Sequence, residues 1–156
     1  MKRKIINLTY KILHNIRNLV FRIFNVKTIG ARALVVNNDQ VLLIKHTYQS
    51  GWYTIGGGVK KNESTREAIV RELLEEVGVI PLEAPHLFAV YHNNFEKRDD
   101  FVAFYIVKKF DIKERYSPEI ADKKWFCFHD LPLEITPSTR RRIEEFLDQR
   151  QKSDRW

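Results

Sequence analysis

Three glutamates, Glu72, Glu75 and Glu76, stand at positions i, i+3 and i+4 of a segment with helical hydrophobic periodicity. That spacing places their carboxylates on one arc of a helix about 100° wide. At about 4 Å two such charges repel by roughly 1 kcal/mol in water and by more near a protein surface. A hard divalent cation offsets the repulsion, and ligands that are all oxygen favour Mg²⁺ or Mn²⁺ over zinc. The opposite arc is apolar and is expected to be buried: Ile69, Val70, Leu73, Leu74 and Val77.

Local signals define where this helix begins and ends. Ser64 with Glu67 three residues later forms a capping box, and Gly78 suits the position just past the helix end. The glycines of 56–58 precede the helix and allow the backbone to approach a ligand closely. The segment therefore predicts a glycine-rich loop, a helix with a carboxylate face and a sharp stop.

The wider spacing decides between a metal site and a merely solvated glutamate face. Gly57 is followed after five residues by Glu63, and after seven more by Arg71-Glu72-Leu73; one residue later come Glu75-Glu76, and after one more Gly78-Val79. All nine of these positions match, so the segment resembles the signature box of the Nudix hydrolases. Further similarity lies in the apolar strand ending at Lys45, the Gly51-Trp52-Tyr53 lead-in, and Trp125-Phe126 followed by Leu131-Pro132.

The resemblance implies an α/β fold, a Nudix-type α/β/α sandwich around a mixed β-sheet, with an extra N-terminal amphipathic helix. The expected organisation is a basic helix over 1–26, a Nudix domain over 27–150 and a C-terminal tail over 151–156. Periodicity predicts a hairpin of 31–36 with 41–45, strands over 87–91, 101–108 and 124–128, and a last helix over 138–150.

The resemblance also implies roles for individual residues. Glu72, Glu75 and Glu76 would hold the cations, with Glu75 as the first choice for the catalytic base. Arg71 would orient a glutamate of the box, and Glu63 would support the same network. A further candidate for metal binding or catalysis is a loop acid six residues before Trp125, Glu119.

Substrate contacts are expected from the glycine loop and from the residues that lead into it. The predicted substrate-binding residues are Gly56, Gly57, Gly58, Lys45, Trp52 and Tyr53, with Tyr48 and His46 as further candidates. The aromatic rings could stack on a base, and Lys45 could meet a phosphate, although such side chains are as often part of a core.

The implied activity is divalent-metal-dependent hydrolysis of a diphosphate (P–O–P) bond in a nucleoside diphosphate linked to another moiety X, a small nucleotide-type molecule. The alternative is a catalytically silent module that binds a nucleotide and regulates a partner; its mark would be a lost box carboxylate. The identity of X depends on variable loops and not on the box. Nudix members that cleave ADP-ribose carry a proline well after the box. No proline lies between Pro85 and Pro118 in this chain, which argues against ADP-ribose as the substrate.

The net charge of +7 is concentrated at one end of the chain. Eight of the 27 basic residues precede the first acid, Asp39, which leaves 19 basic against 20 acidic residues. A domain that is about neutral disfavours a nucleic-acid partner. The pattern of residues 1–26 predicts a basic amphipathic helix. Three contacts are open for its apolar face: a membrane surface, its own domain, or the same helix of a second chain in a homodimer. The expected location is cytoplasmic, with or without association to a membrane surface.

One position departs from the Nudix pattern. Ile55 stands where the family usually has proline, directly before the glycines. Proline would stiffen a turn by fixing φ. Its absence predicts a looser loop without the loss of any metal ligand.

Overall fold

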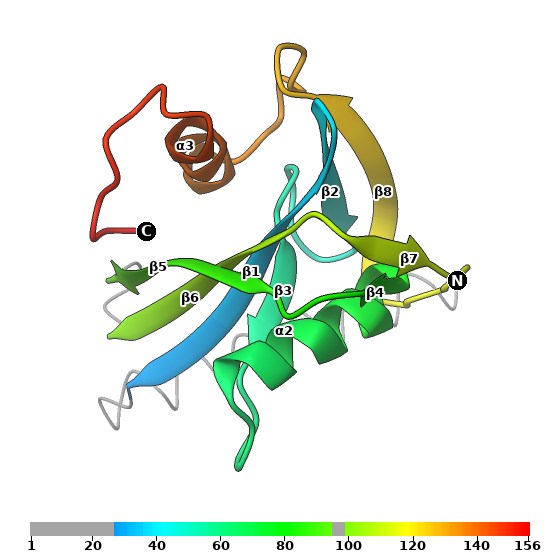
Figure 1. Cartoon of the computed structure of the whole chain (residues 1–156), viewed down its shortest axis with the longest axis vertical. Coiled ribbons are helices and arrows are strands. Elements are labelled where there is room, and N and C mark those ends of the chain that lie inside the picture. The colour runs from blue at the N-terminus through cyan, green and yellow to red at the C-terminus, as the bar shows by residue number, and fades with distance from the viewer. Residues whose placement is uncertain (1–26, 95–98) are drawn as a thin grey trace.

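In the part of the chain that the structure describes, a mixed β-sheet is covered by one helix on each face, as the computed structural model in Figure 1 shows. The structure describes residues 27–94 and 99–156. The sandwich predicted from the sequence is confirmed. The amphipathic helix predicted over 1–26 lies outside the described residues.

The main sheet is six-stranded within the described residues, with the path order β5-β6-β1-β2-β8 and β3 paired to β1. Strand β1 runs parallel to β6, and the other pairs are antiparallel. A second, two-stranded sheet joins β4 to β7. The strand bounds are β1 Thr28–Asn37, β2 Gln40–His46, β3 Ile55–Gly58, β4 Val79–Pro81, β5 His86–Asn93, β6 Asp100–Val107, β7 Phe110–Ile112 and β8 Ile120–Cys127.

The central strand β1 divides two cores by simple alternation of its side chains. Ala31, Ala33 and Val35 face the cluster that includes helix α2, whereas Leu34 and Val36 face the cluster that includes helix α3. Successive side chains of a strand point to opposite faces, so a nearly continuous apolar strand is buried on both sides.

The predicted ends of the box helix are confirmed, but its interior differs from the prediction. Helix α2, Thr65–Glu72, carries the capping box of Ser64 with Glu67. The chain continues as a π-helical turn, Leu73–Val77, and stops at Gly78 in the left-handed conformation with φ 78°. Such π turns are rare and are frequent at functional sites.

The apolar arc predicted for this helix is only partly buried. Ile69, Leu73 and Val77 have 0–1% exposure, whereas Val70 and Leu74 are 38% and 44% exposed. The expectation that all five apolar residues face the core was therefore wrong for Val70 and Leu74. The buried residues hold α2 and the π turn against the sheet.

Ile55 is not part of a loose turn. It begins β3, pairs with Ala33 of β1, and its side chain is fully buried in the core cluster beneath α2. The segment before the box is thus anchored by a core residue, and the effect of the missing proline on its rigidity stays a prediction. Helix α3, Pro137–Phe146, has its N-cap at Thr136 and ends before the predicted residue 150.

After α3 the chain returns to the sheet and runs beside β5. The amide of His92 donates to the carbonyl of Asp154 at 2.8 Å, and the amide of Trp156 donates to the carbonyl of His92 at 3.0 Å. The Trp156 ring packs at the α3 face with Tyr91 and Phe104. Residues 153–156 therefore cover part of the β5 edge.

Among the helices that the structure describes, none has the length and apolar character to cross a membrane.

Candidate active site

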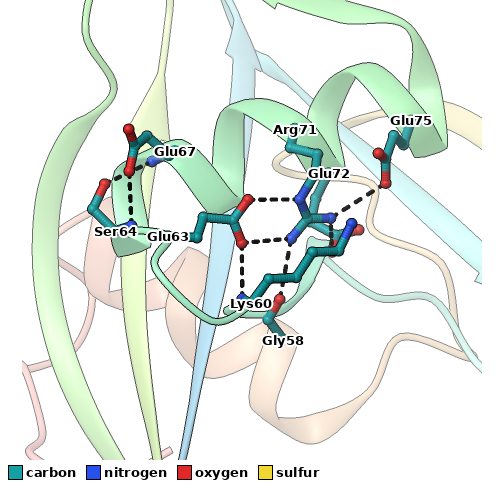
Figure 2. A network of polar contacts seen from close by, with 8 residues as sticks. All are labelled: Gly58, Lys60, Glu63, Ser64, Glu67, Arg71, Glu72 and Glu75. Carbon is teal, nitrogen blue, oxygen red and sulfur yellow. Dashed lines mark hydrogen bonds and ion pairs between the residues drawn. The ribbon is translucent and has the colours of Figure 1, made fainter.

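Arg71 is the centre of the polar network drawn in Figure 2. Its Nε and Nη2 donate to the two oxygens of Glu63 at 2.7 and 2.9 Å, a bidentate pair. Its Nη1 donates to Glu72 Oε1 at 2.6 Å and to Glu75 Oε2 at 3.2 Å. Nη2 also donates to the Gly58 carbonyl at 3.2 Å. One guanidinium thus joins three carboxylates of the box to the glycine loop, as predicted for Arg71 and Glu63.

Glu63 is held in its charged form by this network. Hydrogen bonds from Arg71 and from the Lys60 amide, the latter at 2.9 Å, lower the pKa of Glu63 to about 2. In turn, the hydrogen bonds that Arg71 donates to Glu63 raise the pKa of Arg71. The pair therefore remains ionised throughout the neutral range.

Gly57 lies directly under the carboxylate of Glu72. A Cβ at Gly57 would stand 2.5 Å from Glu72 Oε1 and 2.8 Å from its Cδ, which is closer than real Cβ contacts allow. A Cβ at Gly58 would meet nothing within 4 Å. The glycine requirement at this point of the box is thus steric, and it concerns the position of Glu72.

Gly56 supports the most buried carboxylate of the site. Its φ is +139°, and a Cβ there would collide with the β1 backbone, 2.7 Å from Arg32 Cα. Its amide donates to Glu76 Oε2 at 3.1 Å. Glu76 is only 7% exposed. Burial, followed by the charge of Glu72, raises the pKa of Glu76 to about 8, against the opposing effect of the Gly56 amide.

The three carboxylates predicted for a single helix face are therefore in three environments. Glu75 has 48% of its side chain exposed and Glu72 has 15%, while Glu76 points inward. The π turn explains the difference, because its wider spacing moves residues out of the i, i+4 stacking of an α-helix. The prediction of one common exposed face was wrong for Glu76.

Glu119 lies close enough to this group for its charge to raise the pKa of Glu76. The Glu119 carbonyl accepts the Thr47 amide at 2.9 Å, which ties the loop before β8 to the end of β2. The topology therefore brings a residue 43 positions after Glu76 toward the same carboxylates. The role predicted for Glu119 in metal binding or catalysis stays a prediction.

The chemistry of the donors fits a divalent cation. The charges of Glu72 and Glu119 both act against ionisation of Glu76, and a cation bound to carboxylate oxygens would offset such repulsion. In the described conformation no three acidic, histidine or cysteine side chains of residues 27–94 and 99–156 gather into a metal-binding group. In this conformation Glu72 and Glu75 both contact the guanidinium of Arg71.

The predicted substrate-binding side chains beyond the glycines have other contacts. Lys45 forms an ion pair with Glu134, and its ammonium lies 5.0 Å from the centroid of the Trp52 ring. Trp52 is 6% exposed and belongs to the core on the α3 face. The structure does not bring Lys45 and Trp52 into the polar network around Arg71.

Tyr53 is half-buried, and its hydroxyl donates to the Ser50 carbonyl at 2.8 Å. Burial raises the pKa of Tyr53. The ring of His46 lies 5.0 Å from that of Tyr48 and 5.3 Å from that of Tyr53. These three residues form an aromatic group where β2 ends, next to the loop that leads to the glycines.

Two charged groups near the sheet were missed by the sequence analysis. Arg32 on β1 stands opposite Gly56, donates to the Thr54 carbonyl at 3.1 Å, and its charge opposes the rise in the pKa of Glu76. On the α3 face, Arg142 and Glu145 form an ion pair of 2.7 Å with both side chains at 0% exposure. Nothing in the sequence distinguishes either arginine from its neighbours.

Comparison with known proteins gives consistent matches over this domain. The family model of the NUDIX domain matches residues 26–146. The putative 8-oxo-dGTP diphosphatase of Bacillus subtilis (strain 168) is 31% identical over 120 residues, which cover 76% of this chain and 79% of that protein. The RNA pyrophosphohydrolase of Pasteurella multocida (strain Pm70) is 42% identical over 56 residues, which cover 36% of this chain and 28% of that protein.

Solved structures agree with these matches. The crystal structure of the MutT NUDIX hydrolase from Burkholderia pseudomallei superposes with a TM-score of 0.68 at 27% identity, over 76% of this chain and 97% of that one. The alignment with the RNA pyrophosphohydrolase, by contrast, spans less than a third of that protein's length.

Proposed function

The chain belongs to the Nudix hydrolase family, and from this membership we propose that it hydrolyses the diphosphate (P–O–P) bond of a nucleoside diphosphate linked to another moiety, with Mg²⁺ or Mn²⁺. One observation carries the proposal. Every box carboxylate is present, and Glu63, Glu72 and Glu75 are joined through Arg71 to the glycine loop. A silent, nucleotide-binding module would have no need of the complete set.

Glu72, Glu75, Glu76 and Glu119 are the residues that would hold the cations. A bound divalent cation neutralises the diphosphate and lowers the pKa of a coordinated water. The protein contributes the fixed positions of these ligands. Gly57 leaves room for the Glu72 carboxylate, and the Gly56 amide holds the Glu76 carboxylate.

Glu75 is our choice for the base. It is the most exposed of the three helix carboxylates, and its contact with Arg71 Nη1, at 3.2 Å, is the longest of the ion pairs in this network. Its carboxylate would accept the proton of the water that attacks phosphorus, as the P–O bond to the leaving phosphate breaks. Arg71 acts as a positioning residue, because it is anchored by Glu63 and limits where Glu75 can point.

Small nucleotides are the substrates that the comparisons favour. The relative that aligns over most of its length is named for 8-oxo-dGTP, a nucleoside triphosphate. The similarity to the RNA pyrophosphohydrolase is confined to a short stretch. The moiety X would be selected by the surrounding loops, including the aromatic group of His46, Tyr48 and Tyr53.

A nucleotide panel with and without metal tests the proposal. We expect phosphate-containing products in the presence of Mg²⁺ or Mn²⁺ and none in EDTA. Glu75→Gln should lower kcat by about a hundredfold or more with an unchanged melting temperature. The matched control, Glu114→Gln, changes an exposed loop acid outside the network and should retain full activity. Full activity of Glu75→Gln would remove this residue from the mechanism, and binding without turnover by the intact protein would favour the silent module.

The partners predicted for residues 1–26 can be separated by one deletion. We expect the chain that begins at residue 27 to keep its kcat, because the proposed site lies wholly within the described residues. If the segment binds a membrane surface, only the full chain co-sediments with anionic vesicles at low salt. If it is a dimer interface, the deletion lowers the molar mass measured by light scattering.

A further inference from the structure

A groove of about 380 Å³ lies on the α3 face of the sheet, where β5 begins, β6 ends and α3 ends. Its floor is apolar and aromatic, formed by Phe88, Ile106 and Phe146. These residues belong to or pack against the core cluster that includes α3, whereas the box helix packs on the other face of the sheet. Its volume is in the range of small-molecule sites.

Two lysines reach over the aromatic rings of this groove. The ammonium of Lys152 lies 3.9 Å from the centroid of Phe88, and that of Lys108 lies 5.4 Å from the centroid of Phe146. The two rings pack together with centroids 6.5 Å apart. Neither lysine forms an ion pair with a carboxylate in the part of the chain that the structure describes. Two ammonium groups are thus held at one aromatic surface, and neither is paired with a carboxylate of the described residues.

The two acidic residues of the groove leave an excess of one positive charge. Glu83 is paired with Lys109 at 3.0 Å, so its charge is compensated. Asp148, which follows α3 with a φ of 55°, is the remaining carboxylate. The groove therefore combines two ammonium groups, one hydrogen-bond acceptor and two aromatic faces.

We propose that this groove is a second nucleotide-binding site, distinct from the proposed active site. A phosphate would draw Lys108 and Lys152 off the rings, because a charge-assisted hydrogen bond is stronger than an exposed cation–π contact. The released ring face of Phe88 or Phe146 would then accept a base by stacking. Asp148 would accept an N–H of that base. Inorganic phosphate would use only the lysines, and a nucleoside only the rings and Asp148.

The test uses the full chain in EDTA, so that turnover is prevented, with adenosine 5′-monophosphate as the probe. We expect titration followed by ¹H–¹⁵N NMR to shift the amide signals of Phe88, Lys108 and Phe146. AMP should bind more tightly than either inorganic phosphate or adenosine. Lys108→Ala/Lys152→Ala should raise Kd by roughly tenfold or more, the size expected when charge-assisted contacts are lost.

Lys124→Ala is the matched control, because the Lys124 ammonium also lies over a phenylalanine ring, 5.6 Å from the centroid of Phe126. Lys124 is on β8, at the opposite edge of the sheet from β5. Its Kd for AMP should equal that of the wild type. Shifts confined to the glycine loop and Glu72–Glu76 would overturn the proposal, as would an unchanged Kd in the double variant. Equal affinity for AMP and inorganic phosphate would overturn the assignment to a nucleotide.

Discussion

Two arginine–glutamate clusters lie on opposite faces of the same sheet, and they differ in their access to water. Arg71 has 18% of its side chain exposed and is shared by three carboxylates. Arg142 is fully buried, and the single carboxylate paired with it is Glu145. Its guanidinium also lies 3.8 Å from the ring centroid of Tyr91.

The buried cluster has nearly every contact fixed by packing. Glu145 accepts from Arg142, from the Tyr91 hydroxyl at 2.7 Å and from the Ser153 amide at 3.1 Å. Arg142 also donates to the Arg155 carbonyl at 3.0 Å. This network ties α3, β5 and the C-terminal segment together. Burial, with the hydrogen bond to Glu145, raises the pKa of Tyr91.

The difference separates a structural ion pair from a functional one. A buried charge that loses its partner is left without solvation, so the network on the α3 face cannot rearrange at low cost. The network of Arg71 has an exposed member, Glu75, with 48% of its side chain accessible to solvent. Its contacts should therefore change at a lower cost than those of Arg142. We expect substitutions to affect stability on one face and catalysis on the other.

The largest effect is expected from Glu145→Ala. Removal of this carboxylate leaves Arg142 as an uncompensated buried charge, which should lower the free energy of unfolding by about 3–5 kcal/mol. Urea denaturation measures the change. Glu144→Ala is the control, since Glu144 is half-exposed and pairs with Arg150 on the surface; its loss should cost less than about 1 kcal/mol. Similar costs for the two variants would contradict the distinction between the clusters.

Gly57→Ala should act on catalysis and leave stability almost unchanged. The new methyl group forces the Glu72 carboxylate to move, and the end of a flexible side chain can do so cheaply. We expect kcat to fall on the order of tenfold, which corresponds to about 1.4 kcal/mol in the activation free energy. Gly58→Ala is the matched control, because its Cβ enters open space. Equal kcat values in the two variants would show that the position of Glu72 does not matter.

The smallest effect is expected in the titration of the Glu63 carboxyl group. Because the pKa of Glu63 is lowered to about 2, its ion pair with Arg71 is fully formed above the unfolded-state pKa of about 4.3 and is lost as the pH falls through about 2. Carboxyl ¹³C NMR should therefore show no protonation of Glu63 at pH 4. In Arg71→Lys, which cannot form the bidentate contact, the midpoint should rise. A midpoint near 4 in the wild type would mean that the network is not formed in solution.

Local signals in the sequence predicted the parts of the fold that local interactions determine. The capping box of Ser64, the left-handed Gly78 and the hairpin of β1 with β2 are all confirmed. Strand β3 was not predicted, because Gly56–Gly58 carry no strand propensity and become a strand through their pairing with β1. Long-range pairing of this kind leaves no periodic pattern.

The sequence predicted which residues form the candidate site but not how deeply each one is buried. Motif spacing identified Arg71 and the carboxylates around it, whereas the burial of Glu76 depends on a π turn that an assumed α-helix does not contain. Arg142 stands among three consecutive arginines, Arg140 to Arg142, and is the fully buried member. Only the packing of α3 against β5 and the C-terminal segment distinguishes it from the others.

The parallel pairing of β1 with β6 has a kinetic consequence. Its partners, Thr28 with Asp100 through Val35 with Val107, are 72 residues apart, and the whole box lies within the loop that this pairing closes. Closing such a loop costs chain entropy before the contacts between the two strands form, and high contact order slows folding. The backbone of β1 stands behind Gly56, whose amide holds Glu76. The carboxylates of the box should therefore reach their final positions late in folding, and the isolated peptide of residues 57–79 should bind Mg²⁺ far more weakly than the folded domain.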